Sequence, residues 1–108
     1  MTDVFSKQLI YTGKAIKSDE ALRIGLVNAV VPQAELMDKA LELANQIAAN
    51  APLAVKAAKL CINAEYDMPM DEAITYESGI FGHCFATEDQ KNGMKAFLNK
   101  EKPVFNGK

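Results

Sequence analysis

Apolar residues recur at helical spacing along most of the chain, and glycine and proline residues divide it into pieces of helical length. Between residues 34 and 50 the apolar positions are Leu36, Ala40, Leu43, Ala44 and Ile47, and charged residues occupy the opposite face. Intervals of three and four residues place these side chains on one side of a helix. The pattern therefore predicts an amphipathic helix over 34–50.

End signals add the remaining helices. A short helix over 19–24 is predicted to have Ser18 as its N-cap and Gly25 at the left-handed position that ends it. Further helices are expected in these segments: the opening stretch to about Tyr11, 52–66, 70–86, and from Glu88 onward.

The helix that begins at Glu88 has the clearest start signal. Thr87 and Gln90 have the Ser/Thr-x-x-Glu/Gln spacing of a capping box. This helix is expected to carry three apolar residues on one side: Met94, Phe97 and Leu98. The segment 103–108 that follows is expected to fray.

Two predicted helices carry more apolar surface than a free chain of 108 residues would cover. The helix over 52–66 starts with proline, is apolar on nearly every side and is expected to be buried on more than one face. The helix over 70–86 is expected to turn these residues inward: Met70, Ala73, Ile74, Phe81 and Phe85. Such faces indicate a protein that associates with a partner or with itself.

Residues 26–31 are mostly apolar and partly β-branched, and Pro32 follows them, so they form the one strand candidate. The fold class predicted from these elements is mostly α, with about five helices and one short extended connector. The chain shows no repeat and no linker, so residues 1–108 are expected to form a single helical domain.

Composition narrows the class of protein. The 108 residues are 49% hydrophobic with a formal net charge of -2, which is typical of a folded domain and unsuited to a general nucleic-acid surface. The apolar runs are too short to cross a membrane, and the first residues show no secretory signal, so a cytoplasmic protein is expected. Cys61 and Cys84 are expected to be reduced and mostly buried.

The usual catalytic and metal-binding motifs are not found in the sequence. His83 is adjacent to Cys84, but neighbouring helical residues point about 100° apart, so His83 is interpreted as a structural or surface histidine. Glu77 falls near an apolar stripe and is interpreted as a carboxylate that pairs with a neighbour across a helix contact.

One group of residues has positive chemical content. Phe97 and Lys100 share a helix face, and Phe81 lies on the preceding helix. Two aromatic rings and an ammonium group could hold the base and the phosphate of an adenine nucleotide. The alternative is that the two rings belong to the core and that Lys100 interacts with the helix dipole.

Longer stretches of the chain resemble the crotonase, or enoyl-CoA hydratase, family. The similar segments are Leu9-Ile-Tyr-Thr-Gly13, Ser18-Asp-Glu-Ala-Leu-Arg-Ile-Gly-Leu-Val-Asn28, Ala48-Ala-Asn-Ala-Pro-Leu-Ala-Val55 and Phe85 to Lys100. The resemblance extends from about Lys7 to Phe105 and is closest to short-chain enoyl-CoA hydratases, also described as 3-hydroxybutyryl-CoA dehydratases.

The resemblance implies the helical C-terminal domain of the crotonase fold. The family's ββα core, its oxyanion hole and its two catalytic glutamates precede the Thr12-Gly13 stretch, so no catalytic residue is assigned in this chain. Phe81 and Phe97 match positions around the coenzyme A adenine, and Lys100 matches the lysine at the adenosine phosphate, in each case in the assembled enzyme. In place of the family's basic run after that lysine, this chain has Glu101-Lys102-Pro103.

The same resemblance implies an acyl-CoA thioester as substrate, no separate cofactor, and a homo-oligomer, either a trimer or a dimer of trimers. Partners in the nucleic-acid or membrane class are not expected. The first hypothesis is that the chain is the C-terminal part of a hydratase that adds water reversibly to 2-enoyl-CoA. This part is expected to be inactive by itself and to supply oligomer contacts and part of the coenzyme A pocket. The alternatives are a free-standing helical module that works by association only, and a full-length enzyme that has been cut.

Overall fold

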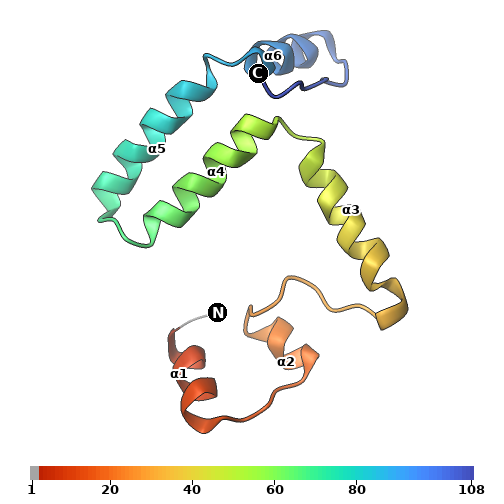
Figure 1. Cartoon of the computed structure of the whole chain (residues 1–108), viewed down its shortest axis with the longest axis vertical. Coiled ribbons are helices and arrows are strands. Elements are labelled where there is room, and N and C mark those ends of the chain that lie inside the picture. The colour runs from red at the N-terminus through yellow and green to blue at the C-terminus, as the bar shows by residue number, and fades with distance from the viewer. Residues whose placement is uncertain (1–2) are drawn as a thin grey trace. The chain divides into compact units, whose positions relative to one another are not determined.

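The computed structural model describes residues 3–108, and it is helical throughout its regular structure. Figure 1 shows the elements α1 (Asp3–Thr12), α2 (Ser18–Arg23), the 3-10 helix η1 (Gln33–Glu35), α3 (Leu36–Ala48), α4 (Pro52–Glu65), α5 (Met70–Cys84) and α6 (Glu88–Asn99). The mostly α fold predicted from the sequence is confirmed. Residues 24–32 form turns, bends and irregular backbone, so the strand candidate over 26–31 is wrong as a strand, although the segment does connect two helices.

The chain divides into two compact units, and the boundary between Ala40 and Leu41 lies inside α3. The first unit contains α1, α2, η1 and the start of α3, and the second contains the end of α3 together with α4, α5 and α6. Within residues 3–108, no helix is both long enough and apolar enough to cross a membrane.

The end of α2 is as the sequence predicts, but its start is not. Gly25 has φ +72°, its N–H donates to the Leu22 carbonyl, and the N–H of the next residue donates to the Ala21 carbonyl at 2.9 Å. This is the paired closure of a Schellman turn. Ser18 is already the first helical residue and Lys17 occupies the N-cap position without a side-chain cap, so the Ser18 cap is wrong.

A guanidinium joins α1 and α2 in the first unit. Arg23 contacts both oxygens of Glu20 at 2.6 Å, and its Cζ atom lies 5.4 Å from the centre of the Phe5 ring. The hydrogen bonds from Arg23 lower the pKa of the Glu20 carboxyl. The pair is exposed, so it fixes the local geometry more than it stabilises the fold.

In the second unit, α4 and α5 run side by side as an antiparallel hairpin (Figure 1). Pro52 is at the start of α4, where its missing N–H costs no hydrogen bond. Small residues are the ones buried in this hairpin: Cys61 on α4 and Ala73, which is 5% exposed, on α5. Small side chains allow two helices to approach closely.

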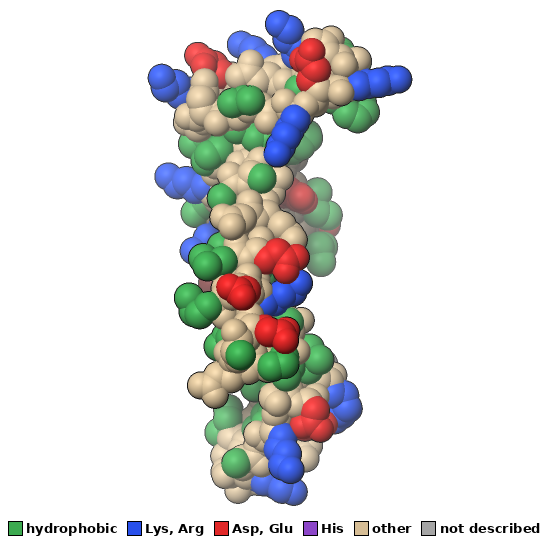
Figure 2. All heavy atoms as spheres, turned by 90° about the vertical axis from the view of Figure 1, so that its right-hand side faces the viewer, with side chains coloured by type: hydrophobic (Ala, Val, Ile, Leu, Met, Phe, Trp, Pro, Cys, Tyr) green, Lys and Arg blue, Asp and Glu red, His purple; other side chains and the backbone are tan. Residues whose placement is uncertain are grey.

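Most large apolar residues of the hairpin are exposed. The prediction that those on α5 point inward is therefore wrong within this chain, whereas the expectation of more apolar surface than the chain covers is confirmed. Only Ala73 of the five residues predicted to point inward from α5 is buried. The exposed apolar side chains of the hairpin include Leu53, Leu60, Ile62, Tyr66, Met70, Ile74, Phe81 and Phe85. Figure 2 shows many apolar side chains open to solvent between the charged ones on one face. The periodicity located apolar faces correctly, but other parts of this chain do not cover them.

We call the segment 101–108 the tail. The prediction that residues 103–108 fray is wrong, because hydrogen bonds hold this segment against α6. The carboxylate of Asp89 accepts the backbone N–H groups of Asn106 at 2.7 Å and Gly107 at 2.8 Å. The carbonyl of Lys108 accepts the N–H groups of Glu88 and Asp89. Free backbone donors at the start of α6 and a buried acid therefore hold the tail.

Candidate functional site

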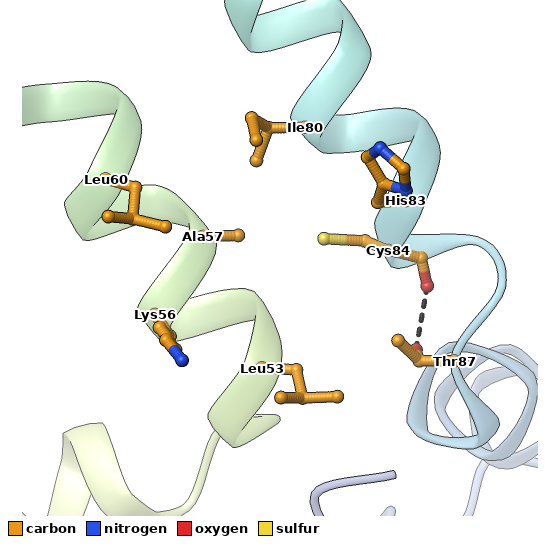
Figure 3. Close-up of a pocket in the computed structure, with 8 residues that line it drawn as sticks. All are labelled: Leu53, Lys56, Ala57, Leu60, Ile80, His83, Cys84 and Thr87. Atoms are coloured by element: carbon orange, nitrogen blue, oxygen red, sulfur yellow. Dashed lines mark hydrogen bonds between the residues drawn. The ribbon is translucent and has the colours of Figure 1, made fainter. Parts of the chain in front are cut away.

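Two hollows lie between α4 and α5. The first has a volume of about 270 Å³, and Figure 3 shows the residues around it: Leu53, Lys56, Ala57 and Leu60 from α4, Ile80, His83 and Cys84 from α5, and Thr87. The second has a volume of about 360 Å³ and is lined by Cys61, Glu65, Glu77, Cys84 and apolar neighbours. Both are mostly apolar, as expected for a groove that packs against protein.

The two cysteines beside these hollows are free thiols. Cys61 is buried and Cys84 is half-buried, in agreement with the prediction of reduced, mostly buried cysteines. Burial raises the pKa of the Cys61 thiol, and the nearby Glu77 and Glu65 carboxylates and the Cys84 thiol raise it further. An activated cysteine requires the opposite shift, towards the thiolate. The shift is away from the thiolate, in line with the buried, reduced thiol expected from the sequence.

His83 is exposed and does not form a catalytic pair with its neighbour. Figure 3 shows the Cys84 thiol pointing towards Ala57 on α4, while the His83 ring lies beside α5 and does not point at the sulfur. This agrees with the interpretation of His83 as a surface histidine. Cys84 contributes its carbonyl to the start of α6, where it accepts the Thr87 hydroxyl at 2.7 Å.

Glu77 does not form the helix-to-helix pair that the sequence suggested. Its side chain is exposed and lines the second hollow. Within the same residues, no cluster of three or more histidine, cysteine, aspartate or glutamate side chains is arranged to hold a metal ion.

The three residues predicted to bind an adenine nucleotide all lie in the second unit and are all exposed. Phe97 is in the last turn of α6 and its ring is 78% exposed, whereas Lys100 follows the helix as its left-handed C-cap. The expectation that both residues share one helix face is therefore wrong, because α6 ends at Asn99. Phe81 is on α5 and packs edge-on against Phe85, with ring centres 5.2 Å apart. The rings are therefore not core residues of this chain, and their predicted role in ligand binding stays a prediction.

Lys100 has an unusual backbone. It is the non-glycine residue with positive φ among residues 3–108, with φ 57° and ψ 37°. Its N–H donates to the Phe97 carbonyl and the N–H of Glu101 donates to the Ala96 carbonyl at 2.8 Å. This Schellman turn ends α6 with lysine in the position that glycine usually takes.

The capping box at Thr87 is half confirmed. The Thr87 hydroxyl oxygen accepts the N–H of Gln90 at 3.1 Å, as the spacing predicts. The N–H of Thr87 donates to the Cys84 carbonyl, so it is paired with the preceding helix instead of with a side chain of α6. The cap therefore also fixes the corner between α5 and α6.

Sequence reasoning missed Asp89, which is 1% exposed and is the buried charged residue of the described chain. Acidic residues are common in the first turn of a helix, so nothing in the local pattern distinguished Asp89 from Glu88. Its partners, Asn106 and Gly107, are far along the chain.

Comparison with known proteins decides the family. A family model described as Enoyl-CoA hydratase/isomerase matches residues 3–108. The chain belongs to the enoyl-CoA hydratase/isomerase family. The resemblance found in the sequence is thus confirmed over the whole described chain.

Curated members of the enoyl-CoA hydratase/isomerase family match most of this chain. A short-chain-enoyl-CoA hydratase of Clostridium acetobutylicum is 56% identical over 90% of the chain and 37% of its own length. A crotonyl-CoA hydratase of Syntrophomonas wolfei is 46% identical over 93% of the chain and 38% of its own length. The chain therefore spans about two fifths of the length of these relatives.

Solved structures of the family show the same helical arrangement. An enoyl-CoA hydratase from Bacillus anthracis has a TM-score of 0.91 and 37% identity, and the match covers 94% of this chain and 40% of that one. An enoyl-CoA hydratase subunit from Geobacillus kaustophilus has a TM-score of 0.89 and 39% identity over the same shares. The helices α1 to α6 are thus a recurring part of enoyl-CoA hydratase structures.

Proposed function

We propose that this chain supplies the helical part of an enzyme that reversibly hydrates short 2-enoyl-CoA thioesters to 3-hydroxyacyl-CoA. The observation that carries the proposal is the 56% identity with a short-chain-enoyl-CoA hydratase over 90% of the chain. Two features of the structure support a contributing role. Apolar helix faces are open, and aromatic and cationic side chains are presented at the end of α6.

The first contribution is to subunit contacts. The α4–α5 hairpin buries small residues inside and leaves large apolar ones outside, including Ile62, Tyr66 and Ile74. Each large apolar side chain that leaves water stabilises an assembly by roughly 1.5–3 kcal/mol. A second copy of the chain, or the rest of the enzyme, is the surface that these helices would contact.

The second contribution is to the site for coenzyme A. The adenine base would stack on the exposed rings of Phe81 and Phe97, and the Lys100 ammonium would pair with the adenosine phosphate. No residue of this chain is proposed to handle protons in the hydration, because the resemblance places the catalytic glutamates and the oxyanion hole before Thr12-Gly13.

The direct test is activity. The purified 108-residue chain is expected to show no hydration of crotonyl-CoA above the uncatalysed rate, since general acid–base groups and an oxyanion hole are both needed. A turnover comparable to that of a full-length hydratase of the family would contradict the proposal. Disappearance of the enoyl thioester absorbance measures it.

The association test uses two neighbouring residues on α4. Ile62→Lys places a charge on the exposed apolar face and is expected to shift the molar mass measured by light scattering towards that of the monomer. The matched control Asn63→Lys adds the same charge at an exposed polar position and is expected to leave the assembly intact. A monomeric wild-type chain at micromolar concentration would contradict the subunit-contact role.

The coenzyme test compares two lysines near the end of α6. Lys100→Ala is expected to weaken binding of coenzyme A about tenfold by isothermal calorimetry, because a charge-assisted contact is lost. The control Lys102→Ala, which removes an exposed lysine two residues on, is expected to have little effect. Self-association without any coenzyme A binding would favour the alternative function, a helical module that acts by association only.

A further inference from the structure

We propose that Asp89 is a positioning residue that holds Lys100 in place by fastening the tail to the start of α6. The inference rests on the proposed function in one respect, namely that Lys100 contacts the phosphate of coenzyme A. Its structural part, the coupling between Asp89 and the turn at Lys100, depends on the chain alone.

The fastening begins with a carboxylate that is 1% exposed. Both of its oxygens are used: Oδ1 accepts the N–H of Asn106 at 2.7 Å, and Oδ2 accepts the N–H of Gly107 at 2.8 Å. An ionised acceptor strengthens each of these bonds. A buried charge with two backbone donors favours one position of the tail, because any displacement leaves the carboxylate without partners.

Further hydrogen bonds hold the same residues of the tail. The Lys108 carbonyl accepts the N–H of Glu88 at 2.8 Å and that of Asp89 at 3.2 Å. The Asn106 amide donates to a Glu88 oxygen at 3.1 Å. These bonds occupy backbone donors at the start of α6 that the helix itself cannot satisfy.

The tail also lies against α6 at its middle and against the start of α4. A Cβ atom added to Gly93 would lie 3.4 Å from the Phe105 ring, and one added to Gly107 would lie 3.7 Å from the Pro52 ring. The tail therefore runs back along α6 from its end to its beginning. A closed loop results, in which Lys100 is the reversal point.

The reversal needs such support. Lys100 has left-handed backbone angles, φ 57° and ψ 37°, which disfavour a residue with a Cβ atom. A residue in this conformation persists when the surrounding structure imposes it. Because the tail is fixed at Asp89 and α6 is a helix, the turn between them sets the direction of the Lys100 side chain relative to Phe97.

Amide hydrogen exchange of the full 108-residue chain tests the coupling without any ligand. Asp89→Asn keeps the shape of the side chain but replaces one acceptor oxygen with a donor. Exchange at Asn106 and Gly107 is expected to become at least about tenfold faster, since charge-assisted bonds are lost. Exchange at Glu101 is expected to accelerate as well, although its N–H is bonded to Ala96 and not to Asp89.

The matched control is Asp71→Asn, which removes an exposed carboxylate from the equivalent second position of α5. It is expected to leave all three amides unchanged. Should Asp89→Asn free Asn106 and Gly107 but leave Glu101 as slow as in the wild type, the tail does not support the turn and the positioning role is overturned. Unchanged exchange at Asn106 would overturn the fastening itself.

A second variant lacks residues 106–108 and leaves α6 intact, so it answers the objection that Asp89→Asn disturbs the helix. It is expected to accelerate exchange at Glu101 to the same degree, and adding Asp89→Asn to it is expected to change nothing more. Independent, additive effects would show that Asp89 does not act through the tail.

Ligand binding tests the consequence for Lys100. Asp89→Asn is expected to weaken coenzyme A about fivefold while leaving 3′-dephospho-coenzyme A unchanged, because only the former carries the phosphate that Lys100 contacts. Equal weakening of both ligands would overturn the positioning role. If the wild-type chain binds the two ligands equally, the proposed phosphate contact fails and positioning fails with it, whereas the exchange result still decides the fastening.

Discussion

The α4–α5 hairpin and the α6–tail segment lie in the same unit of the chain but reach stability in different ways. The hairpin has an apolar seam of small residues such as Cys61 and Ala73, and it leaves its large apolar side chains exposed. The α6–tail segment has polar fastenings at both ends, at Asp89 and at the turn of Lys100. One region leaves apolar surface uncovered, and the other satisfies its own polar groups.

The difference reflects the two kinds of interaction. Burial of apolar surface is not directional, so a partner of suitable shape can provide it. Hydrogen bonds require a specific donor and acceptor, and an unpaired buried carboxylate is costly. We therefore expect changes inside the hairpin seam to separate helices, and changes in α6 to act locally.

The largest effect is expected from a charge in the hairpin seam. Ala73→Asp would bury a carboxylate at a position that is 5% exposed, and should destabilise the chain by about 3 kcal/mol. Ser78→Asp adds the same group at an exposed position of α5 and should change stability little. Urea unfolding followed by circular dichroism measures both. Equal stability of the two variants would mean that the seam does not hold α4 and α5 together.

Loss of the α6 cap should have a smaller effect. Thr87→Ala removes the acceptor for the Gln90 N–H and the donor to the Cys84 carbonyl, and should cost about 1 kcal/mol. Thr87→Ser retains both groups and should be close to the wild type. If alanine and serine were equivalent in the same urea experiment, the hydroxyl would not contribute to the corner between α5 and α6.

A gain of stability is expected at the other end of α6. Lys100→Gly relieves the left-handed backbone of a residue with a Cβ atom, and should stabilise the chain by roughly 0.5 kcal/mol after the entropy of glycine is subtracted. Lys100→Ala keeps the unfavourable backbone and should not stabilise it. Both variants should bind coenzyme A more weakly, so a glycine that stabilises and binds normally would argue against a ligand role for Lys100.

The sequence predicted the parts of the fold that depend on nearby residues. The closing turn at Gly25 and the hydroxyl cap at Thr87 are set by residues within one helical turn, and both are present. The Ser18 cap was wrong by one position, because the backbone at Lys17 is already the extended residue before the helix. Local signals thus place helices well and their first residue less well.

Features that depend on distant residues were not predictable. Residues 103–108 were expected to fray because they end the chain, whereas their partner Asp89 lies on α6. The outward direction of the large apolar residues on α5 could not be found either, since periodicity identifies an apolar face but not what covers it. For the candidate site, the resemblance predicts Phe81, Phe97 and Lys100, and the left-handed backbone of Lys100 could not be predicted from the sequence.

The smallest effect is expected on the ionisation of the Cys61 thiol. This ionisation reports how far water reaches the contact between α4 and α5. Burial and the neighbouring Glu77 and Glu65 carboxylates raise the pKa of this thiol in the folded chain. In a Cys84→Ser background, alkylation of Cys61 should therefore have its pH midpoint above that of the same chain unfolded in urea. Glu77→Gln should lower the midpoint, and Glu72→Gln, on an exposed part of α5, should not.

The same shift has a defined sign for stability. A thiol whose pKa is higher in the folded state stabilises the fold fully below its unfolded pKa, and this contribution is lost as the pH rises through the folded value. The wild-type chain should therefore lose stability in the alkaline range above the ordinary thiol pKa, and Cys61→Ser should lose less. If the pH midpoint for alkylation of Cys61 were at or below that of the unfolded chain, water would reach the contact between α4 and α5. The hairpin would then not be a packed element.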